Sequence, residues 1–430
     1  MKTFYTINLG CRVNLFETNA VTYQLVQKGF KQVNNINKAN VVLINTCTVT
    51  NKADAKSRNM ISKAKHAKLK PIVIVMGCFS QLNQQWCKDK ADIVIGTKYR
   101  NKIVEYLAKY LNDKKPICKI NKDINKFEEF GCFKHLNNTR AVLKIQDGCD
   151  FYCSYCEIPY ARGQKRSMPH KHILSLIKDY VKYGYKEIVI TGVNTSEYKD
   201  GNYTFLDLLI DINKISGKFR ARLSSLEPFQ MSEKMIDIFA SNKDRWANQL
   251  HLCLQNANNE ILHAMNRRYT IEQYISFVKY IRSKMPNIAI TTDYIVGFGN
   301  ETQKQFEDGL KNLKKLNFAN MNVFIYSRRH GTVADRQFKK DISPLTCRDR
   351  YNKVVDLKNK CQYNYIKTFV GKTLEVLVEK SKTPLMHGYS SEFVKVLFNS
   401  SKNLRNKLVK VKIQQVKQDG QNYYLFGQKI

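Results

Sequence analysis

Short apolar runs alternate with helix-length amphipathic segments along the first quarter of the chain. The runs "KTFYTINLG", "ANVVLINTC", "PIVIVMGC" and "ADIVIGT" are rich in Val, Ile and Leu, and the segments between them include "ETNAVTYQLVQKGF" and "KADAKSRNMISKAKHA". Strands that are buried on both faces of a parallel sheet have such continuous apolar runs, and the helices between them serve as crossovers. The pattern predicts a parallel α/β domain over residues 1–112.

A second series of strand-like runs begins near residue 140. Its members lie at 141–146, 187–191, 221–225, 250–255, 288–296 and 322–327. Between them are amphipathic stretches long enough for helices, such as "HKHILSLIKDYVKYGY" and "TIEQYISFVKYIRSK". Six β–α repeats predict a parallel (βα)6 barrel or part-barrel, which we place over residues 135–365.

The connection after the first series and the tail of the chain have patterns of their own. Residues 97–139 are polar, rich in Lys and weakly periodic, so we expect an interdomain connection within them. The tail, residues 367–430, contains "KTLEVLVEK", "EFVKVLF", "NKLVKVKIQQV" and "NYYLFGQ" with no helical segment among them. Such alternation predicts a small antiparallel β-barrel, so that the whole chain is expected to be an α/β protein of three domains.

Length and composition fit a folded protein of several domains. The chain has 430 residues, of which 43% are hydrophobic. No apolar run approaches the length of about 18 residues that a membrane span needs, and Asn8 and Arg12 interrupt the N-terminal stretch before a signal-peptide core could form. We therefore expect a cytoplasmic protein that does not enter the membrane.

The net charge changes the picture because it indicates a polyanionic partner. The chain has 72 Lys and Arg against 36 Asp and Glu, which gives a formal net charge of +36. Nucleic acid is the first partner that such a balance suggests, and an anionic membrane surface is the second. Asn, Ile, Lys and Tyr are all abundant, as an AT-rich coding sequence would make them. Compositional drift is therefore an alternative source of the lysines, and the charge alone leaves both explanations open.

Three of the twelve cysteines occupy equivalent places in the first domain. A large chain without an export signal is expected to stay reduced, which favours metal binding over disulfides. Cys11, Cys47 and Cys78, called the N-terminal trio below, each follow a predicted strand. Because the carboxyl ends of parallel strands meet at one edge of a sheet, the trio is expected to form one metal site. The alternative is three unrelated small buried residues.

The remaining single cysteines share no such register. For each of them, a place in the core or an incidental position is the better interpretation. They are Cys87, Cys118, Cys132, Cys253, Cys347 and Cys361.

A second trio lies close together in "DGCDFYCSYCEIPYARG". Cys149, Cys153 and Cys156, the loop trio, have the spacing C-x3-C-x2-C directly after the first strand of the predicted barrel. Structural zinc usually has four ligands, commonly in C-x2-C pairs, and this segment offers no such pair of pairs. An iron–sulfur cube held by three thiolates keeps one iron open to a small molecule, so the spacing favours a catalytic cluster over structural zinc.

The loop trio and the later strand ends together resemble the radical S-adenosylmethionine (radical SAM) superfamily. The strand ends are "TGVN" (191–194), "SSLEP" (224–228), "LHLCLQ" (250–255) and "DYIVGFGNE" (293–301). The resemblance implies that the open iron of a [4Fe–4S] cluster on the loop trio binds S-adenosylmethionine. It also implies cofactor contacts from Thr191, Gly192, Ser224, Glu227 and Gln255.

With the N-terminal trio in "LGCRVN", "NTCTVT" and "VMGCFSQ" and a β-barrel tail, the whole chain resembles the radical SAM methylthiotransferases. This resemblance implies a second [4Fe–4S] cluster on Cys11, Cys47 and Cys78 that supplies sulfur, and radical chemistry at adenine C2 in place of side-chain acid or base catalysis. The flanking residues look most like the branch that acts on N6-threonylcarbamoyladenosine beside the anticodon of tRNA. The alternatives are isopentenyladenosine in tRNA and a ribosomal-protein aspartate.

The resemblance also implies partners and exposes three departures. The tail would be an RNA-binding TRAM domain, Arg162, Lys165 and Arg166 would hold tRNA phosphates, and a separate electron donor would be needed. Glu157, "LQNANN" and "GFGNE" differ from the usual family residues, which puts details of cofactor contact in doubt. A non-catalytic RNA-binding protein with a structural metal is the alternative from a different functional class.

Overall fold

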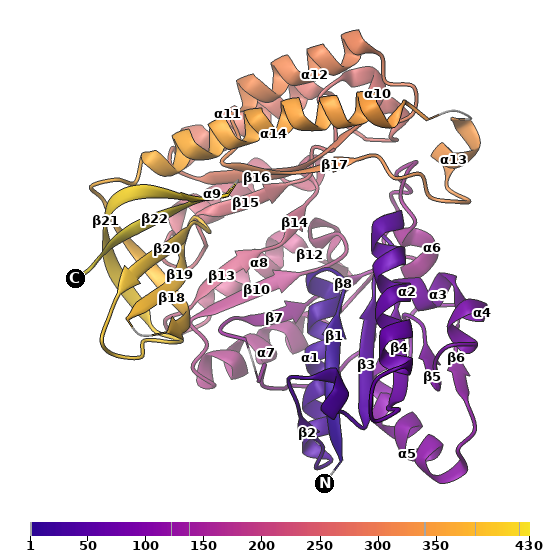
Figure 1. The fold of residues 1–430 in the computed structure, drawn as a ribbon. Helices are drawn as coiled ribbons and strands as arrows, with labels where there is room; N and C mark the ends of the chain where they lie inside the picture. Colours follow the sequence, from indigo (N-terminus) through magenta and orange to yellow (C-terminus); the bar gives the residue numbers. More distant parts are fainter. Residues whose placement is uncertain (1, 122, 137, 339–340, 383, 421) are drawn as a thin grey trace.

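The chain folds into three parts that follow one another along the sequence (Figure 1). The computed structural model describes every residue except 1, 122, 137, 339–340, 383 and 421, and at 380–382 it describes the backbone alone. The first part is a parallel α/β domain, the second is an open barrel of parallel strands, and the third is a small closed β-barrel. This arrangement confirms the predicted α/β fold class.

The first part is a parallel sheet of six strands in the order β2-β1-β3-β4-β5-β6. The strands are β1 (Thr3–Asn8), β2 (Lys31–Gln32), β3 (Val41–Thr46), β4 (Ile72–Gly77), β5 (Ile93–Ile95) and β6 (Ile117–Lys119). The helices are α1 (Arg12–Gln27), α2 (Asn51–Lys65), α3 (Cys78–Leu82), α4 (Gln84–Lys88) and α5 (Ile103–Asp113). Every residue of β3 is buried, as its unbroken apolar sequence predicts.

The boundary predicted at residue 112 is too early. The strand β6 lies beyond it and pairs in parallel with β5, and α5 lies inside the segment expected to be a connection. Ile103 and Leu107 are the buried residues of α5, and Val104, Tyr106 and Leu111 pack beside them on the sheet. The segment before residue 114 is therefore an amphipathic helix of the first domain, whose apolar face the prediction of a connection overlooked.

The second part is a part-barrel of six parallel strand positions. Its strands are β7 (Ala141–Lys144), β10 (Glu187–Thr191), β13 (Arg220–Leu223) continued by β14 (Ser225–Leu226), β15 (Gln249–Leu252), β16 (Ala289–Val296) and β17 (Asn320–Ile325). Two short ladders, β8 (Gln146–Asp147) with β9 (Arg166–Ser167) and β11 (Lys199–Asp200) with β12 (Tyr203–Thr204), lie in the connections. All six predicted strands are therefore present, with their bounds shifted by up to three residues.

The helices of the part-barrel are α6 (Ile158–Arg162), α7 (His170–Lys182), α8 (Phe205–Lys214), α9 (Glu233–Ser241), α10 (Asn259–Ala264), α11 (Ile271–Lys284), α12 (Gln303–Leu316), α13 (Val333–Gln337) and α14 (Pro344–Lys367). The longer helices lie outside the sheets, whereas α6 packs beside α3 of the first part and α13 lies on a loop away from the strands (Figure 1). Capping boxes begin α8, α11 and α12, each from a threonine whose hydroxyl accepts a backbone N–H of the first turn. Local sequence therefore determines where these helices begin.

The tail forms a closed barrel in the order β18-β19-β20-β22-β21. Its strands are β18 (Thr373–Lys382), β19 (Leu385–Ser390), β20 (Lys395–Asn399), β21 (Leu408–Asp419) and β22 (Asn422–Lys429). Closure depends on a parallel pair, β20 with β22, whereas the other four pairs are antiparallel as predicted. The strand β19 was not predicted, because His387 and Gly388 interrupt its apolar pattern. Gly388 is required there, since a Cβ would lie 2.1 Å from the carbonyl oxygen of Leu377.

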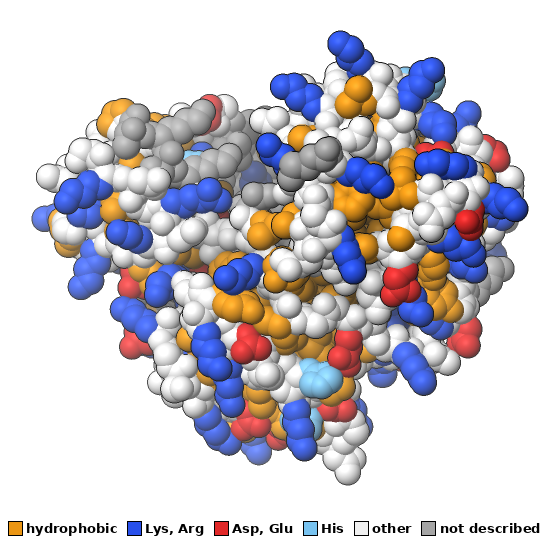
Figure 2. Space-filling view, turned by 90° about the horizontal axis from the view of Figure 1, so that it is seen from below, with side chains coloured by type: hydrophobic (Ala, Val, Ile, Leu, Met, Phe, Trp, Pro, Cys, Tyr) orange, Lys and Arg blue, Asp and Glu red, His pale blue; other side chains and the backbone are white. Residues whose placement is uncertain are grey.

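Basic side chains are spread over the surface. Figure 2 shows Lys and Arg scattered over the described part of one face, with fewer Asp and Glu and with hydrophobic side chains between them. In the part of the chain that the structure describes, none of the helices combines the length and hydropathy needed to cross a bilayer.

Candidate active site

The loop trio is held by a tight connection between β8 and α6. The backbone N–H of Cys149 donates to the carbonyl of Gly163 at 3.2 Å, and that of Cys156 donates to the carbonyl of Cys153 at 2.9 Å. Gly148, which precedes the trio, has a φ of +74°, and a Cβ there would lie 2.0 Å from the carbonyl oxygen of Gln164. The glycine of "DGC" therefore permits the close approach that places three half-buried thiols in one loop.

Hydrogen-bond donors face two thiols of the loop trio. The Nη1 of Arg267 lies 3.3 Å from the Sγ of Cys153, and the backbone N–H of Ile158 lies 3.4 Å from the Sγ of Cys156. Burial raises the pKa of the Cys149 thiol to about 12. A neutral thiol is therefore favoured without metal, and ligation by a cation is what would hold the group as a thiolate.

Two buried carboxylates lie beside Cys149 and act on its pKa. Burial raises the pKa of both Glu197 and Glu227. Glu227 is ion-paired with Arg267, and Glu197 with Lys165 at 2.9 Å. The loop trio thus faces groups of both signs, which suits a ligand that carries both an amino and a carboxylate group.

The end of β10 is tied to the loop trio by one glutamine. Gln146 accepts a hydrogen bond from the backbone N–H of Asn194 at 2.8 Å and donates to the carbonyl of Gly148 at 2.7 Å. A Cβ on Gly192 would lie 2.9 Å from the Cβ of Gln146, so the glycine of "TGVN" allows the two segments to touch. Sequence analysis did not single out Gln146, because nothing in "KIQDG" distinguishes a buried glutamine from an ordinary strand-end polar residue.

The other predicted cofactor residues are distributed around the same strand ends. Thr191 ends β10 and is buried, and the hydroxyl of Ser224 lies 3.0 Å from that of Thr195. Gln255 has a φ of +67°, and its backbone pairs with Asp293 and Ile295. These hydrogen bonds fix where the residues lie around the strand ends. Their contact with a cofactor stays a prediction.

The N-terminal trio is assembled from three neighbouring strand ends. Cys11 precedes α1, Cys47 follows β3 directly, and Cys78 begins α3 directly after β4. Because β1, β3 and β4 are adjacent in the sheet, the parallel topology brings the three residues to one edge. Burial raises the pKa of Cys78 to about 12, and charges on Cys47 and Cys11 act in the same direction, as expected of thiols that lie near one another.

Arg162 links the N-terminal trio to a buried network of charges. Its Nε lies 3.3 Å from the Sγ of Cys78, and its Nη1 lies 3.0 Å from Glu17 and 2.8 Å from Asp147. Four cationic side chains meet three carboxylates in this network, which consists of Arg100, Lys144, Arg162, Arg166, Glu17, Glu128 and Asp147. The surplus positive charge stabilises a thiolate at Cys78, so the surroundings fit a bound metal cluster.

The network corrects a prediction from the sequence. Arg162 and Arg166 were expected to hold tRNA phosphates, but their side chains are 1% and 5% exposed and both are ion-paired to Asp147. Both side chains lie inside the domain interface, where they offer almost no exposed surface to a phosphate. Lys165 remains half-exposed, with Glu197 and Asp150 as partners, and its contact with RNA stays a prediction.

Neither trio has the spacing of a single zinc ion. Tetrahedral zinc with Zn–S bonds of about 2.3 Å places its sulfur ligands about 3.8 Å apart. Among the described residues, the one group of His, Cys, Asp or Glu whose ligand atoms all lie within 4.8 Å of one another is His251, Cys253 and Asp293. In each trio, at least two of the sulfur atoms therefore lie more than 4.8 Å apart.

A partly buried set of charges joins the two cysteine regions. Arg329 lies 2.7 Å from Glu157, which follows Cys156, and 2.6 Å from Asp54 on α2. The hydroxyl of Thr48, which follows Cys47, donates to Glu157 at 3.2 Å. The unusual Glu157 therefore connects the loop trio to the N-terminal domain. Arg329 lies far away in the sequence, and no motif marks it.

The other two departures from the family pattern contact each other. Asn256 in "LQNANN" donates to Glu301 in "GFGNE" at 3.2 Å, and Glu301 also accepts from the N–H of Gly297 at 2.9 Å. Arg350 on α14 completes the buried pair at 2.8 Å. The two unusual segments are complementary, since each supplies a partner for the other.

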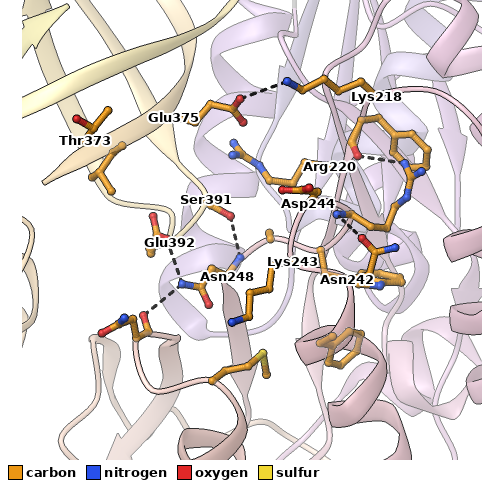
Figure 3. Close-up of a pocket in the computed structure, with 18 of the residues that line it drawn as sticks. Lys218, Arg220, Asn242, Lys243, Asp244, Asn248, Thr373, Glu375, Ser391 and Glu392 are labelled. Atoms are coloured by element: carbon orange, nitrogen blue, oxygen red, sulfur yellow. Dashed lines mark hydrogen bonds and ion pairs between the residues drawn. The ribbon is translucent and has the colours of Figure 1, made fainter. Parts of the chain in front are cut away.

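A cavity of about 360 Å³ lies beside Cys11 of the N-terminal trio. All three parts of the chain line it: Cys11 and Arg12, then Thr191, Ser224, His251 and Asp293 of the part-barrel, then Phe393 of the tail. A substrate in this cavity would meet Cys11 and the predicted cofactor residues Thr191 and Ser224. A separate groove of about 780 Å³ lies where the tail barrel packs on the amino ends of the strands, with Lys218, Arg220 and Glu375 on its walls (Figure 3). It is at the opposite end of the barrel from the loop trio.

Comparison with known families and proteins fits this geometry. The family described as "Uncharacterized protein family UPF0004" matches residues 3–96, and the radical SAM superfamily matches residues 143–313. The chain is 32% identical, over 96% of its length and 94% of the relative's, to the threonylcarbamoyladenosine tRNA methylthiotransferase of Bacillus subtilis. It is 34% identical, over the same shares, to the tRNA-2-methylthio-N(6)-dimethylallyladenosine synthase of Clostridium novyi.

Solved structures share the fold at low sequence identity. The radical S-adenosylmethionine methyltransferase TsrM of Kitasatospora setae is 12% identical with a TM-score of 0.52, and covers 75% of this chain and 73% of its own. The cobalamin-dependent S-adenosylmethionine radical enzyme OxsB is 12% identical with a TM-score of 0.54, covering 84% of this chain and 56% of its own. These likenesses support the arrangement of an α/β domain beside a radical SAM part-barrel.

Proposed function

Because the chain belongs to the radical SAM methylthiotransferase family, we propose that it converts N6-threonylcarbamoyladenosine beside the anticodon of tRNA to its 2-methylthio derivative. The observation that carries the proposal is the cavity that Cys11 lines together with the predicted cofactor residues Thr191, Gly192 and Ser224, in a chain related along nearly its full length to an enzyme of that name. S-adenosylmethionine and a [4Fe–4S] cluster follow from the radical SAM family.

The six cysteines divide between two clusters in this proposal. Cys149, Cys153 and Cys156 hold the radical SAM cluster, and Cys11, Cys47 and Cys78 hold a second [4Fe–4S] cluster. When bound, the first cluster and S-adenosylmethionine supply the radical chemistry that opens the C–H bond at adenine C2, and the second cluster supplies sulfur. The hydrogen bonds to Cys153, Cys156 and Cys78 support this division, since each stabilises a thiolate.

The chain's own residues hold and shield the reactants. Arg267 and Glu227 form a buried pair beside the loop trio, where they would orient the amino and carboxylate groups of S-adenosylmethionine. Thr191, Gly192 and Ser224 line the same cavity and would complete that site. The side chain of Phe393 closes part of the wall from the tail, which limits access of water.

RNA binding is assigned to the tail barrel, residues 367–430, as a TRAM domain. A second cavity of about 390 Å³ shares Thr291, Asn320 and Phe393 with the first and continues along Tyr389 and Tyr424. The rings of Tyr389 and Phe393 stack with centroids 4.7 Å apart, and such platforms bind unpaired bases. Radical chemistry consumes an electron, so a separate electron donor is a further partner.

The test is an anaerobic reaction with two anticodon stem-loop RNAs. One carries N6-threonylcarbamoyladenosine and the other N6-dimethylallyladenosine, because relatives with either name are similar to this chain. Mass spectrometry of the nucleosides is expected to show a 2-methylthio group on the threonylcarbamoyl RNA alone. Product on the dimethylallyl RNA alone, or a colourless protein with zinc and no iron, would contradict the proposal.

A further inference from the structure

Arg12 places a positive charge on the wall of the cavity beside Cys11. It is the first residue of α1, follows Cys11 directly, and is partly buried. Its guanidinium carbon lies 5.7 Å from the ring centroid of Phe393, which lines the same cavity from the tail barrel. The side chain therefore lies between the N-terminal domain and the tail, on the wall of this cavity.

The neighbouring arginines have anionic partners, and Arg12 does not. Arg140, Arg220 and Arg222 all pair with Glu187, at 2.6, 2.6 and 2.7 Å. Arg140 also pairs with Glu379 of the tail. Among the described residues, the guanidinium of Arg12 forms no hydrogen bond or ion pair. Glu187 is the carboxylate whose charge acts on Arg12, and three other arginines already pair with it.

The rest of the cavity wall offers no competing cation for an anionic ligand. His251 is paired with Asp293 at 3.3 Å, and Asp293 also accepts a hydrogen bond from Asn322 at 2.9 Å. The other polar lining residues are uncharged, namely Thr191, Ser224, Ser225, Gln249, Thr291, Thr292, Asn320 and Asn322. An anion that enters the cavity would therefore be attracted to Arg12, while hydroxyl and amide groups remain for neutral polar atoms.

The substrate of the proposed function carries such an anion. The threonylcarbamoyl group on N6 of adenine ends in a carboxylate and a hydroxyl, both of which need polar partners when they leave water. The reacting atom C2 and the substituted carbon C6 flank the same ring nitrogen, N1. When C2 lies in the cavity beside Cys11, the substituent on N6 lies within reach of the same wall.

We propose that Arg12 binds the carboxylate of the threonylcarbamoyl group and so selects this nucleoside over adenosine with a neutral substituent. The assignment rests on the proposed function. A guanidinium that already packs beside an aromatic ring is pre-oriented for bidentate carboxylate binding, so little side-chain freedom is lost on binding. Arg12 is a specificity-determining residue in this proposal and takes no part in the radical step.

The test measures the affinity of anticodon stem-loop RNAs for the cluster-loaded protein. The Arg12→Gln variant is expected to bind the threonylcarbamoyl RNA about 10- to 100-fold more weakly than the wild type does, because it loses one charge-assisted contact. Its affinity for the unmodified adenosine RNA is expected to equal that of the wild type. The Arg12→Lys variant keeps the positive charge, so its affinity for the threonylcarbamoyl RNA is expected to lie between those of the wild type and Arg12→Gln. Arg348→Gln, an exposed arginine on α14 away from the cavity, is the matched control and should change neither affinity.

A change in the RNA tests the same contact without altering the protein. Conversion of the carboxylate to a neutral amide should weaken binding to the wild type by the same factor, and the amide RNA should bind Arg12→Gln no more weakly than the carboxylate RNA does. Equal loss on modified and unmodified RNA would show a phosphate contact and overturn the proposal, as would unchanged affinity for the amide RNA. If the wild type makes no 2-methylthio product on the threonylcarbamoyl RNA, the proposed function itself fails. If the wild type makes the product and Arg12→Gln binds this RNA as tightly as the wild type does, only the role of Arg12 is overturned.

Discussion

The two cysteine trios are assembled in opposite ways. The loop trio lies within eight residues, and local hydrogen bonds around Gly148 and Gly163 set its shape. The N-terminal trio spans 68 positions of sequence from Cys11 to Cys78 and exists only when β1, β3 and β4 pair in register. Its thiols range from exposed to buried, whereas the three of the loop trio are all half-buried. The first site depends on a loop and the second on a whole sheet.

The difference extends to how each trio is balanced electrostatically. The loop trio has Arg267, from its own domain, beside Cys153. The N-terminal trio has Arg162, from the other domain, beside Cys78, and Arg162 is tied to Glu17 on α1. The part-barrel thus contributes to the surroundings of both trios, and the N-terminal trio cannot be completed by its own domain.

The largest effects should come from removing one cysteine of each trio. Cys149→Ala is expected to abolish S-adenosylmethionine cleavage, because the loop trio would lose a ligand. Cys47→Ala should leave cleavage intact and stop sulfur insertion, and each variant should retain about half of the iron of the wild type. The measurements are 5′-deoxyadenosine release, modified nucleoside and iron content. Loss of cleavage in both variants would show that the two trios do not have separate roles.

Arg162 tests whether the N-terminal trio depends on the domain interface. Arg162→Met leaves Glu17 and Asp147 buried with one cation fewer, so we expect the free energy of unfolding to fall by about 3–5 kcal/mol. Urea unfolding followed by circular dichroism measures this change. Lys214→Met is the matched control, because its ion pair with Asp211 is largely exposed and should contribute less than about 1 kcal/mol. Similar losses in both variants would rule out a special role for the buried network.

Acid should weaken the same interface as the pH falls below about 4.5. Burial alone would raise the pKa of Glu17, but Arg100, Arg162 and Lys144 together hold it at about 2. The unfolded chain binds this proton near pH 4.5, so the stabilisation is complete above that pH and is lost as the pH falls toward 2. The loss from Glu17 is about 3 kcal/mol. Unfolding free energies of the wild type and Glu17→Gln across this range should converge, and parallel curves would contradict the assignment.

The features that could be predicted from the sequence are those whose residues repeat at a regular spacing or lie close together in the chain. The Val- and Ile-rich runs of β3 and β4 predicted the parallel sheet, and the sheet then predicted where Cys11, Cys47 and Cys78 would meet. The spacing of the loop trio was visible directly. In each case, a regular pattern in the residues corresponds to a regular backbone element.

The partners of those residues could not be predicted in the same way. Arg162 was expected to face RNA because a basic residue beside an active site commonly does so, and its burial against Glu17 depends on how two domains pack. Arg267 and Arg329 reach the trios from more than 100 residues away, and neither stands in a periodic context. Long-range pairing of single side chains leaves no local pattern in a sequence.

The smallest of these effects should come from the link between the two regions. Arg329→Gln leaves Glu157 and Asp54 partly buried without their shared cation, and we expect a loss of about 2 kcal/mol in the free energy of unfolding. Its neighbour Arg328 pairs with the exposed Asp341, so Arg328→Gln should cost less than about 1 kcal/mol. Because Glu157 and Thr48 lie next to a cysteine of each trio, Arg329→Gln should also reduce sulfur insertion more than S-adenosylmethionine cleavage. Equal reduction of both reactions would mean that Arg329 supports the fold as a whole and does not set the position of one trio relative to the other.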